Sequence, residues 1–230
     1  MPFVDRSDAG RKLAAALAKY KGQRAVVLAL PRGGVVVAAE VARMLEAPLD
    51  LILVRKIGAP SEPELAMGAI VDGAEPIVVR NEDVIGLLGV SEAQFKAVSD
   101  RELAEIERRR RRYLGTRARA EVAGGVAIVI DDGIATGATA RAALQATRQR
   151  RPEKLVMAVP VAPTATIEVL QREADDVVCL EAYEYFGAIG FFYSDFRQVS
   201  DQEVIDLLAR FPVSPRAEIT QPALTARQSP

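Results

Sequence analysis

The sequence predicts an α/β protein organised around a parallel β-sheet. Apolar runs typical of buried strands alternate with segments of helical periodicity along most of the 230 residues. The clearest run, residues 126–130, reads Val-Ala-Ile-Val-Ile, and such a mostly β-branched run is typical of a strand covered on both faces. Sheets of this kind bind ligands beyond the carboxyl ends of their strands, so the residues after each strand are the first candidates for function.

The first half of the chain opens with a helix over residues 7–20, because Leu13, Leu17 and Tyr20 fall on one helical face. The elements that follow are assigned from buried apolar runs, helical spacing and turn residues. They are strands at 24–30, 49–54 and 77–80, a helix at 35–45 and a Gly/Pro-rich loop at 58–63.

The second half opens with a long polar helix that begins at Ser91, where Ser-Glu-Ala-Gln has the spacing of a capping box. This helix is expected to extend to about residue 114, because its larger apolar residues recur on one side. The remaining elements are strands at 126–130, 154–159 and 177–180 and helices from 139, at 164–173 and at 201–211, the last capped by Ser200.

These elements are expected to form one domain over residues 1–211. Within it, residues 80–121 are expected to form a helical insertion and residues 182–198 a small hood. The aromatic residues between 183 and 196 suit two roles equally, stacking on a planar base or forming the core of the hood itself. Residues 212–230 are rich in Pro, Ser, Thr and Gln and are predicted to be disordered.

The composition excludes several classes of function. The net charge of −1 gives no global case for nucleic-acid binding. The chain contains no histidine, which removes the usual general base and any Ser–His or Cys–His pair. The single cysteine, Cys179, cannot form an intramolecular disulfide and is expected to be a core residue. No apolar run reaches the length of a membrane span, and a cytoplasmic location is expected.

Five consecutive arginines at residues 108–112 are the local exception to this charge balance. Five residues cover more than one helical turn, so their charges point in all directions, and glutamates precede them at helical spacing. A solvated helix face is therefore expected, with a nucleic-acid or phosphate partner as the alternative.

The most specific signal lies in residues 125–139. Asp131 and Asp132 directly follow the apolar strand, and a turn of small residues then opens into a segment of strong helix propensity. Amide groups at such a helix N-terminus can hold a phosphate, while the carboxylates accept hydrogen bonds from vicinal hydroxyls. The combination indicates a ribose 5-phosphate ligand. The simpler alternative is an ordinary strand-to-helix turn, whereas a nucleotide P-loop is excluded because no Gly-Lys-Ser/Thr closes the turn.

Two other strand ends carry groups suited to a diphosphate. Arg32, Gly33 and Gly34 follow the first strand, where glycine amides can approach an anion closely and the guanidinium can bind it in bidentate fashion. Arg55 and Lys56 follow the second strand. Because successive strand residues alternate faces, we expect Lys56 rather than Arg55 to contact the diphosphate. A plain surface turn is the alternative at both places.

These three segments, in this order, resemble the binding sites of type I phosphoribosyltransferases, whose fold is a Rossmann-like parallel sheet flanked by helices. Asp-Asp-Gly-Ile-Ala-Thr-Gly-Ala-Thr at 131–139 is similar to the family's motif for 5-phosphoribosyl 1-diphosphate (PRPP). Pro-Arg-Gly-Gly-Val and Val-Arg-Lys-Ile-Gly-Ala-Pro look closest to segments of bacterial proteins known only as predicted phosphoribosyltransferases. In the family, a non-proline cis peptide often turns the amides of the Arg-Gly-Gly loop toward the diphosphate.

The resemblance implies PRPP as a substrate and Mg²⁺ as a cofactor. It implies that Lys56, Arg32, Asp131 and Asp132 are the catalytic residues, with the two aspartates meeting the metal directly or through water. The residues implied at the diphosphate are Arg32, Gly33, Gly34 and Lys56. Those implied at the ribose 5-phosphate are Asp131, Asp132, Gly133, Ala135, Thr136, Gly137, Ala138 and Thr139.

The implied reaction transfers the 5-phosphoribosyl group to a nitrogen of a base-like acceptor and releases diphosphate, which is the work of a pentosyltransferase. Two departures from the 6-oxopurine enzymes, Ala135 and Ala162 in place of an aspartate and a lysine, put guanine and hypoxanthine in doubt. The sequence does not identify the acceptor. The alternative function is a regulator of the same fold that senses PRPP or a nucleotide without turnover. No nucleic-acid or membrane partner is expected, and a homodimer is left open.

Overall fold

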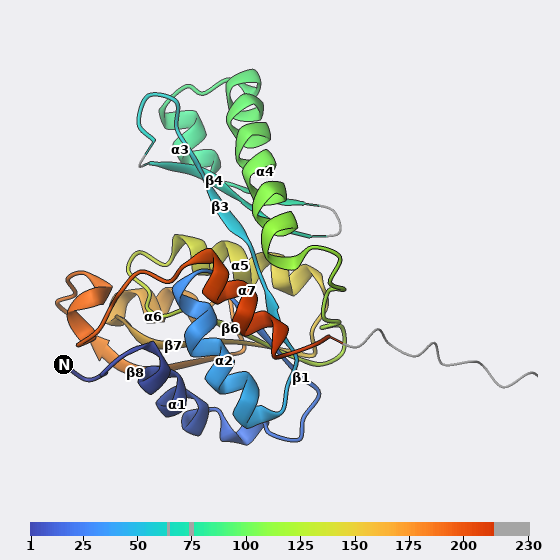
Figure 1. Ribbon diagram of the computed structural model, residues 1–230. Helices are drawn as coiled ribbons and strands as arrows, with labels where there is room; N and C mark the ends of the chain where they lie inside the picture. The colour runs from blue at the N-terminus through green and yellow to red at the C-terminus, as the bar shows by residue number, and fades with distance from the viewer. Residues whose placement is uncertain (64, 74–75, 214–230) are drawn as a thin grey trace, which may run out of the picture.

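The computed structural model describes residues 1–63, 65–73 and 76–213. Its centre is a five-stranded parallel sheet in the order β2-β1-β6-β7-β8 (Figure 1). The predicted disordered tail, residues 212–230, lies outside the described residues except for its first two positions. The strands are β1 (Ala25–Ala29), β2 (Leu49–Leu51), β6 (Val126–Ile130), β7 (Lys154–Pro163) and β8 (Asp176–Tyr183).

Helices cover both faces of the sheet, and the alternation of strand residues decides which face each side chain reaches. Val27 and Ile128, which are register partners, pack toward α1, α2 and α7, while Leu28 and Val129 pack toward α5 and α6. Because both faces are buried, the strands read as continuous apolar runs. The helices are α1 (Arg6–Ala16), α2 (Gly33–Leu45), α5 (Ala138–Gln149), α6 (Thr164–Leu170) and α7 (Asp201–Ala209). The predicted α/β class with a parallel sheet is thereby confirmed.

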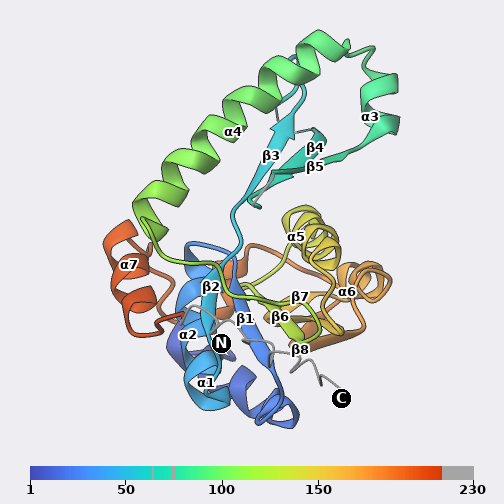
Figure 2. The same cartoon turned by 90° about the vertical axis from the view of Figure 1, so that its right-hand side faces the viewer.

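A second unit projects from this layer structure in both views (Figures 1 and 2). It is an antiparallel sheet in the order β3-β4-β5, joined to two helices. We call it the arm. It packs around the buried side chains of Ile57, Met67 and Ile106. Its elements are β3 (Val54–Gly58), β4 (Ala66–Val71), β5 (Ile77–Arg80), α3 (Glu82–Leu87) and α4 (Glu92–Leu114).

The start of the arm differs from the prediction of a single strand over residues 49–54. β2 ends at Leu51, and the chain enters a different sheet at Val54. Ile52 and Leu53 are as buried as the strand residues, so the apolar pattern shows no break at this point. The start of α4 was predictable, since Ser91 and Gln94 form the expected capping box. Among the described residues no helix has the length and apolar character that crossing a membrane requires.

Candidate active site

The loop after β1 and the turn after β6 touch each other at the carboxyl edge of the sheet. A Cβ on Gly34 would lie 2.9 Å from the backbone oxygen of Ile130 and from Cα of Asp131. A Cβ on Gly33 would lie 1.8 Å from Oδ2 of Asp132. The peptide bond between Pro31 and Arg32 is cis. Only glycine at both positions allows the two segments to come this close.

Asp132 is held by residues from both ends of the folded chain. Its Oδ2 accepts a hydrogen bond from Nε of Arg6 at 2.6 Å, and both side chains are almost fully buried. The same guanidinium lies 3.8 Å from the ring centroid of Phe196 and donates to the backbone oxygen of Arg197 at 2.8 Å. Tyr193 donates its hydroxyl to the backbone oxygen of Asp132. α1 and the hood therefore fix this carboxylate jointly.

Asp131 is placed differently from its neighbour. Its Oδ1 accepts from the backbone N–H of Asp132 at 2.9 Å, and its side chain lines a small recess of about 60 Å³. Burial, together with the adjacent charge of Asp132, raises the pKa of the Asp131 carboxyl well above its usual value. Thr139, Arg55 and Arg109 line the same recess. We call this space the Asp131 recess.

The turn between Asp132 and α5 is fixed from two sides. Ile134 donates its N–H to the backbone oxygen of Val161 at 3.0 Å, and Thr166 donates its hydroxyl to the backbone oxygen of Ala135 at 2.8 Å. Gly137 ends the turn with φ at +78°, in the left-handed region that favours glycine. No side chain among the described residues caps α5, so the N–H groups of its first turn remain available to an anion.

The hood lies directly on this turn. A Cβ on Gly133 would come within 2.4 Å of Cγ2 of Ile189, so glycine allows the hood to pack closely there. The hood aromatics stack on one another, with ring centroids 4.8 Å apart in the pair of Tyr183 and Phe192. The pair of Phe186 and Phe192 has the same separation. These stacked aromatics form a core for the hood, whereas Tyr185 and Phe191 are 93% and 70% exposed and leave the second role open.

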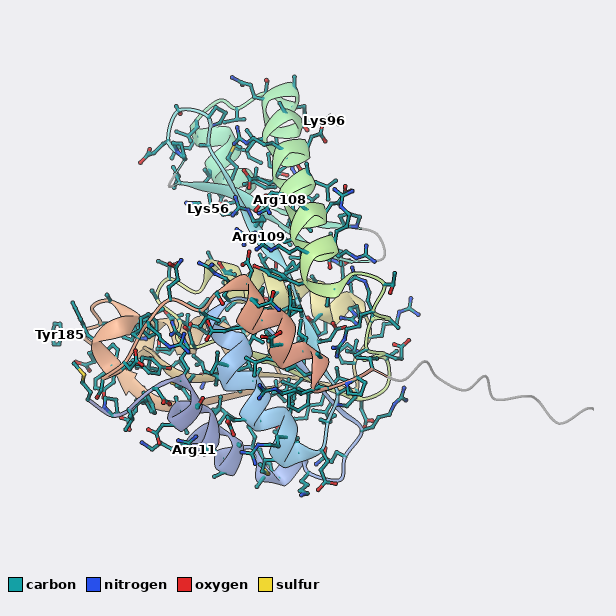
Figure 3. The ribbon with its side chains drawn as sticks, viewed as in Figure 1. Arg11, Lys56, Lys96, Arg108, Arg109 and Tyr185 are labelled. Carbon is teal, nitrogen blue, oxygen red and sulfur yellow. The ribbon has the colours of Figure 1, made fainter. Side chains whose placement is uncertain are left out.

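A larger cavity of about 630 Å³ separates the arm from α5. Lys56 lines it from β3, opposite Thr136, Ala138 and Thr139 at the start of α5. Lys56 and Arg55 are neighbours on one strand and line different cavities, as the alternation of strand side chains requires. Figure 3 shows Lys56 and Arg109 on the arm where it approaches the parallel sheet.

Arg32 is the predicted site residue that faces elsewhere in this structure. Its Nη1 lies 3.7 Å from Oδ1 of Asp201, at the start of α7. That carboxylate also accepts a hydrogen bond from the hydroxyl of Tyr113, at 2.6 Å, and forms an ion pair with Nε of Arg112, at 3.0 Å. The amides of Gly33 and Gly34, which begin α2, stay beside the acidic pair.

The donors present suit a magnesium ion that arrives with its substrate. The described residues contain no group of three or more Asp, Glu, Cys or His side chains able to enclose a metal. Mg²⁺ in phosphate-transfer sites is usually bound through one or two carboxylates, substrate oxygens and water. Two carboxyl groups meet that requirement. Asp131 lines a cavity, and Asp132 uses one oxygen to bind Arg6.

Several site residues were not predicted from the sequence. Arg6 lies 126 positions from Asp132, and no local pattern marks it. Thr166 and Ile189 hold the turn through contacts that only the folded chain reveals. Arg109 did carry a signal, because it belongs to the run of five arginines. The run alone does not indicate which of the five faces a cavity.

Fold and site together define a doubly wound α/β protein whose charged and polar groups gather at the carboxyl edge of the sheet. The family described as "Phosphoribosyl transferase domain" matches residues 5–196. The chain belongs to this phosphoribosyl transferase family.

Individual relatives agree with that assignment. Two curated proteins from Mycobacterium tuberculosis strains CDC 1551 / Oshkosh and H37Rv, each named "Putative phosphoribosyl transferase", are 47% identical over 208 residues. These matches cover 90% of this chain and 46% of each relative, so the chain spans about half the length of the curated relatives it matches. The crystal structure of TT1426 from Thermus thermophilus is 41% identical, with a TM-score of 0.80, and the match covers 93% of this chain and all of that one.

Proposed function

We propose that this protein transfers the 5-phosphoribosyl group of PRPP to a nitrogen atom of a base-like acceptor and releases diphosphate. The observation that carries the proposal is the convergence of Asp131, the uncapped start of α5 and Lys56 on the two cavities between the arm and the sheet. Carboxylates for vicinal hydroxyls, amides for a phosphate and cations for a diphosphate are the groups that PRPP requires.

The ribose 5-phosphate is assigned to the turn after β6. Asp131 and Asp132 accept hydrogen bonds from the ribose hydroxyls, with Arg6 keeping Asp132 in place. The residues of the turn and of the first turn of α5 hold the 5′-phosphate and fix its position. They are Gly133, Ala135, Thr136, Gly137, Ala138 and Thr139.

The diphosphate is assigned to the loop after β1 and to the arm. The amides of Gly33 and Gly34 and the ammonium of Lys56 stabilise the negative charge that develops on the leaving group. Arg32 joins them when its side chain turns away from Asp201. Asp131 and Asp132 would hold a Mg²⁺ ion that arrives with the substrate, and the ion would neutralise part of the diphosphate charge.

The reaction exchanges one bond at C1 of the ribose. The C1–O bond breaks and its electron pair leaves with the diphosphate, while the lone pair of the acceptor nitrogen forms the new C1–N bond. The proton of that nitrogen passes to water. Positive charge on the ribose ring in the transition state is stabilised by the nearby carboxylates of Asp131 and Asp132. The chain's contribution is thus mainly orientation and electrostatic stabilisation.

The acceptor is proposed only as a class, a planar nitrogen base. Ala135 and Ala162 leave the 6-oxopurines disfavoured. Melting temperatures measured with a panel of nucleoside monophosphates identify which base the product carries. A product that binds tightly raises the melting temperature, since stabilisation grows as RT ln(1 + [L]/Kd).

The first prediction concerns the acidic pair. The double variant Asp131→Asn, Asp132→Asn loses both acidic groups that receive the ribose and is expected to weaken PRPP binding at least 100-fold, about 2.7 kcal/mol or more. Isothermal titration calorimetry with magnesium PRPP measures the effect. The matched control is Asp100→Asn, Asp206→Asn, which makes the same change at two exposed positions and leaves the affinity unchanged. Equal affinities of the two double variants would overturn the site assignment.

A sensor without turnover is the second candidate, favoured by the contact of Arg32 with Asp201 instead of a cavity. A sensor needs the ribose-phosphate site alone, whereas the enzyme also needs cations that stabilise a leaving diphosphate. Release of diphosphate from PRPP in the presence of a panel of bases distinguishes the two. Stoichiometric PRPP binding with no release for any base supports the sensor.

A further inference from the structure

The five arginines of α4 are not equivalent in the folded chain. The Arg109 side chain is 31% exposed, against 55% for Arg108 and 53% for Arg112. Arg110 and Arg111 are exposed, and within the described part of the chain no ion pair is found for either. Only one member of the run is therefore turned toward the interior of the site.

Helical geometry fixes the direction of Arg109. Ile106 lies one turn earlier on α4, is 1% exposed and lines the Asp131 recess. Residues three apart on a helix share a face, so the burial of Ile106 turns Arg109 toward the same recess, which it also lines. Tyr113, one turn later, is buried on this face as well.

A single glutamate positions the Arg109 side chain. Glu105 accepts from Nε of Arg109 at 2.8 Å and from Nε of Arg108 at 2.7 Å. These two arginines lower the pKa of Glu105 to about 2, so the carboxylate stays ionised throughout the neutral range. The bond uses only Nε of Arg109. Among the described residues, no partner is found for its two terminal nitrogens.

The recess that Arg109 lines suits an anionic group rather than a base. The recess is small, at about 60 Å³, and its lining is polar and charged beside apolar walls. Its ionisable lining comprises the guanidinium groups of Arg55 and Arg109 and the acidic group of Asp131. Glu102 already pairs Arg55 through Nε and one terminal nitrogen, so the guanidinium that presents both terminal nitrogens is that of Arg109. Apolar walls formed by Leu30, Leu53 and other side chains strengthen the attraction to an anion.

We propose that Arg109 binds a phosphoryl group of the diphosphate, both in the substrate and as the leaving group, and that Glu105 is its positioning residue. This inference rests on the proposed function. It makes the long helix of the arm part of the active site and gives one arginine of the run a specific ligand. Pro31, from the loop assigned to the diphosphate, also lines the recess, so this loop and Arg109 border the same space.

The test compares two identical substitutions on one helix, Arg109→Gln and Arg110→Gln. The probes are magnesium diphosphate and ribose 5-phosphate, each titrated by calorimetry. Loss of a charge-assisted bidentate contact is expected to weaken diphosphate binding by roughly 10- to 100-fold in Arg109→Gln. Ribose 5-phosphate binding is unchanged in both variants, and Arg110→Gln binds both probes as the wild type does. Arg109→Lys keeps the positive charge but lacks the two parallel N–H donors of a guanidinium. It is expected to bind diphosphate more tightly than Arg109→Gln and more weakly than the wild type.

Glu105→Gln tests the positioning role. It is expected to weaken diphosphate binding less than Arg109→Gln does, and to add nothing further in the Arg109→Gln background, since residues that act through one another are not additive. Melting curves establish that each variant is folded.

Three outcomes overturn the inference. The wild type does not bind diphosphate, Arg109→Gln and Arg110→Gln bind diphosphate with equal affinity, or Arg109→Gln loses as much affinity for ribose 5-phosphate as for diphosphate. The proposed function fails separately, on PRPP binding and the acidic-pair variant.

Discussion

At the scale of single residues, the site depends on glycines, which have no side chain, as much as on its charged and polar side chains. Gly33 and Gly34 allow the loop after β1 to reach the acidic pair, and Gly133 allows Ile189 of the hood to reach the turn. Any Cβ at these places meets another atom at less than 3.0 Å, a distance that real Cβ contacts essentially never show. The close approach of three separate segments therefore requires glycine at three positions.

Gly34→Ala is expected to destabilise the protein by roughly 1–3 kcal/mol, because its Cβ meets backbone atoms of Ile130 and Asp131 that cannot rotate away. Urea unfolding measures the change. Gly86→Ala on α3 is the matched control, since a Cβ there has nothing within 4 Å and glycine-to-alanine in a helix stabilises by about 0.5–1 kcal/mol. The strain argument is wrong if both substitutions change the free energy of unfolding in the same direction.

At the scale of elements, the buried ion pair of Arg6 and Asp132 joins α1, the turn after β6 and the hood. A buried pair adds little net stability when it is complete, yet the loss of one partner leaves a buried charge uncompensated. Phe196 and Arg197 cover the guanidinium from the hood side, so the environment of Asp132 depends on three elements at once.

Arg6→Gln is expected to lower the free energy of unfolding by about 3 kcal/mol, the lower end for a broken buried pair, because both side chains retain slight exposure. Arg11→Gln, the same change on the same helix, is expected to have an effect within about 0.5 kcal/mol, since Arg11 is 55% exposed and lies on the outer side of α1 (Figure 3). Asp132→Asn in the Arg6→Gln background should recover part of the loss. A double variant less stable than Arg6→Gln contradicts this account.

The sequence predicted most elements because their signals are local. The capping box at Ser91, the N-cap at Ser200 and the apolar run of β6 each lie within a few residues, and all three are present. The switch from β2 to the arm was not predictable, since Ile52 and Leu53 continue the apolar pattern across the boundary between two sheets. Which sheet a buried residue joins depends on distant partners.

The candidate site divides in the same way. Asp131, Lys56 and Thr139 belong to short motifs that could be read directly, and each of them lines a cavity. Arg6 and Arg109 meet the site through contacts with residues far along the chain, and only the folded structure brings them there.

At the scale of the whole molecule, the arm and the parallel sheet face each other across both cavities. On the side of the arm, β3 and α4 line the Asp131 recess, and β3, β4 and β5 line the larger cavity. On the side of the parallel sheet, the turn after β6 and the start of α5 line them. A ligand that fills this space contacts both parts and links their motions.

One bound molecule of magnesium PRPP is therefore expected to slow amide hydrogen exchange in two separate places, β3 and the turn at residues 133–139. α6 beyond Thr166 lines neither cavity and serves as the internal control. Hydrogen exchange followed by mass spectrometry gives the comparison. Protection of the turn without protection of β3 would show that the arm takes no part in binding.

The contact of Arg6 with Asp132 and Phe196 also has a consequence for the order in which the chain is made. Of these three residues, Arg6 leaves the ribosome before the others, Asp132 follows 126 residues later, and Phe196 comes last. Domains fold as units during synthesis, with N-terminal parts first. A nascent chain stopped before residue 196 contains every residue of the acidic motif, yet its Arg6–Asp132 pair still lacks the aromatic cover. Completion of the site thus coincides with completion of the domain.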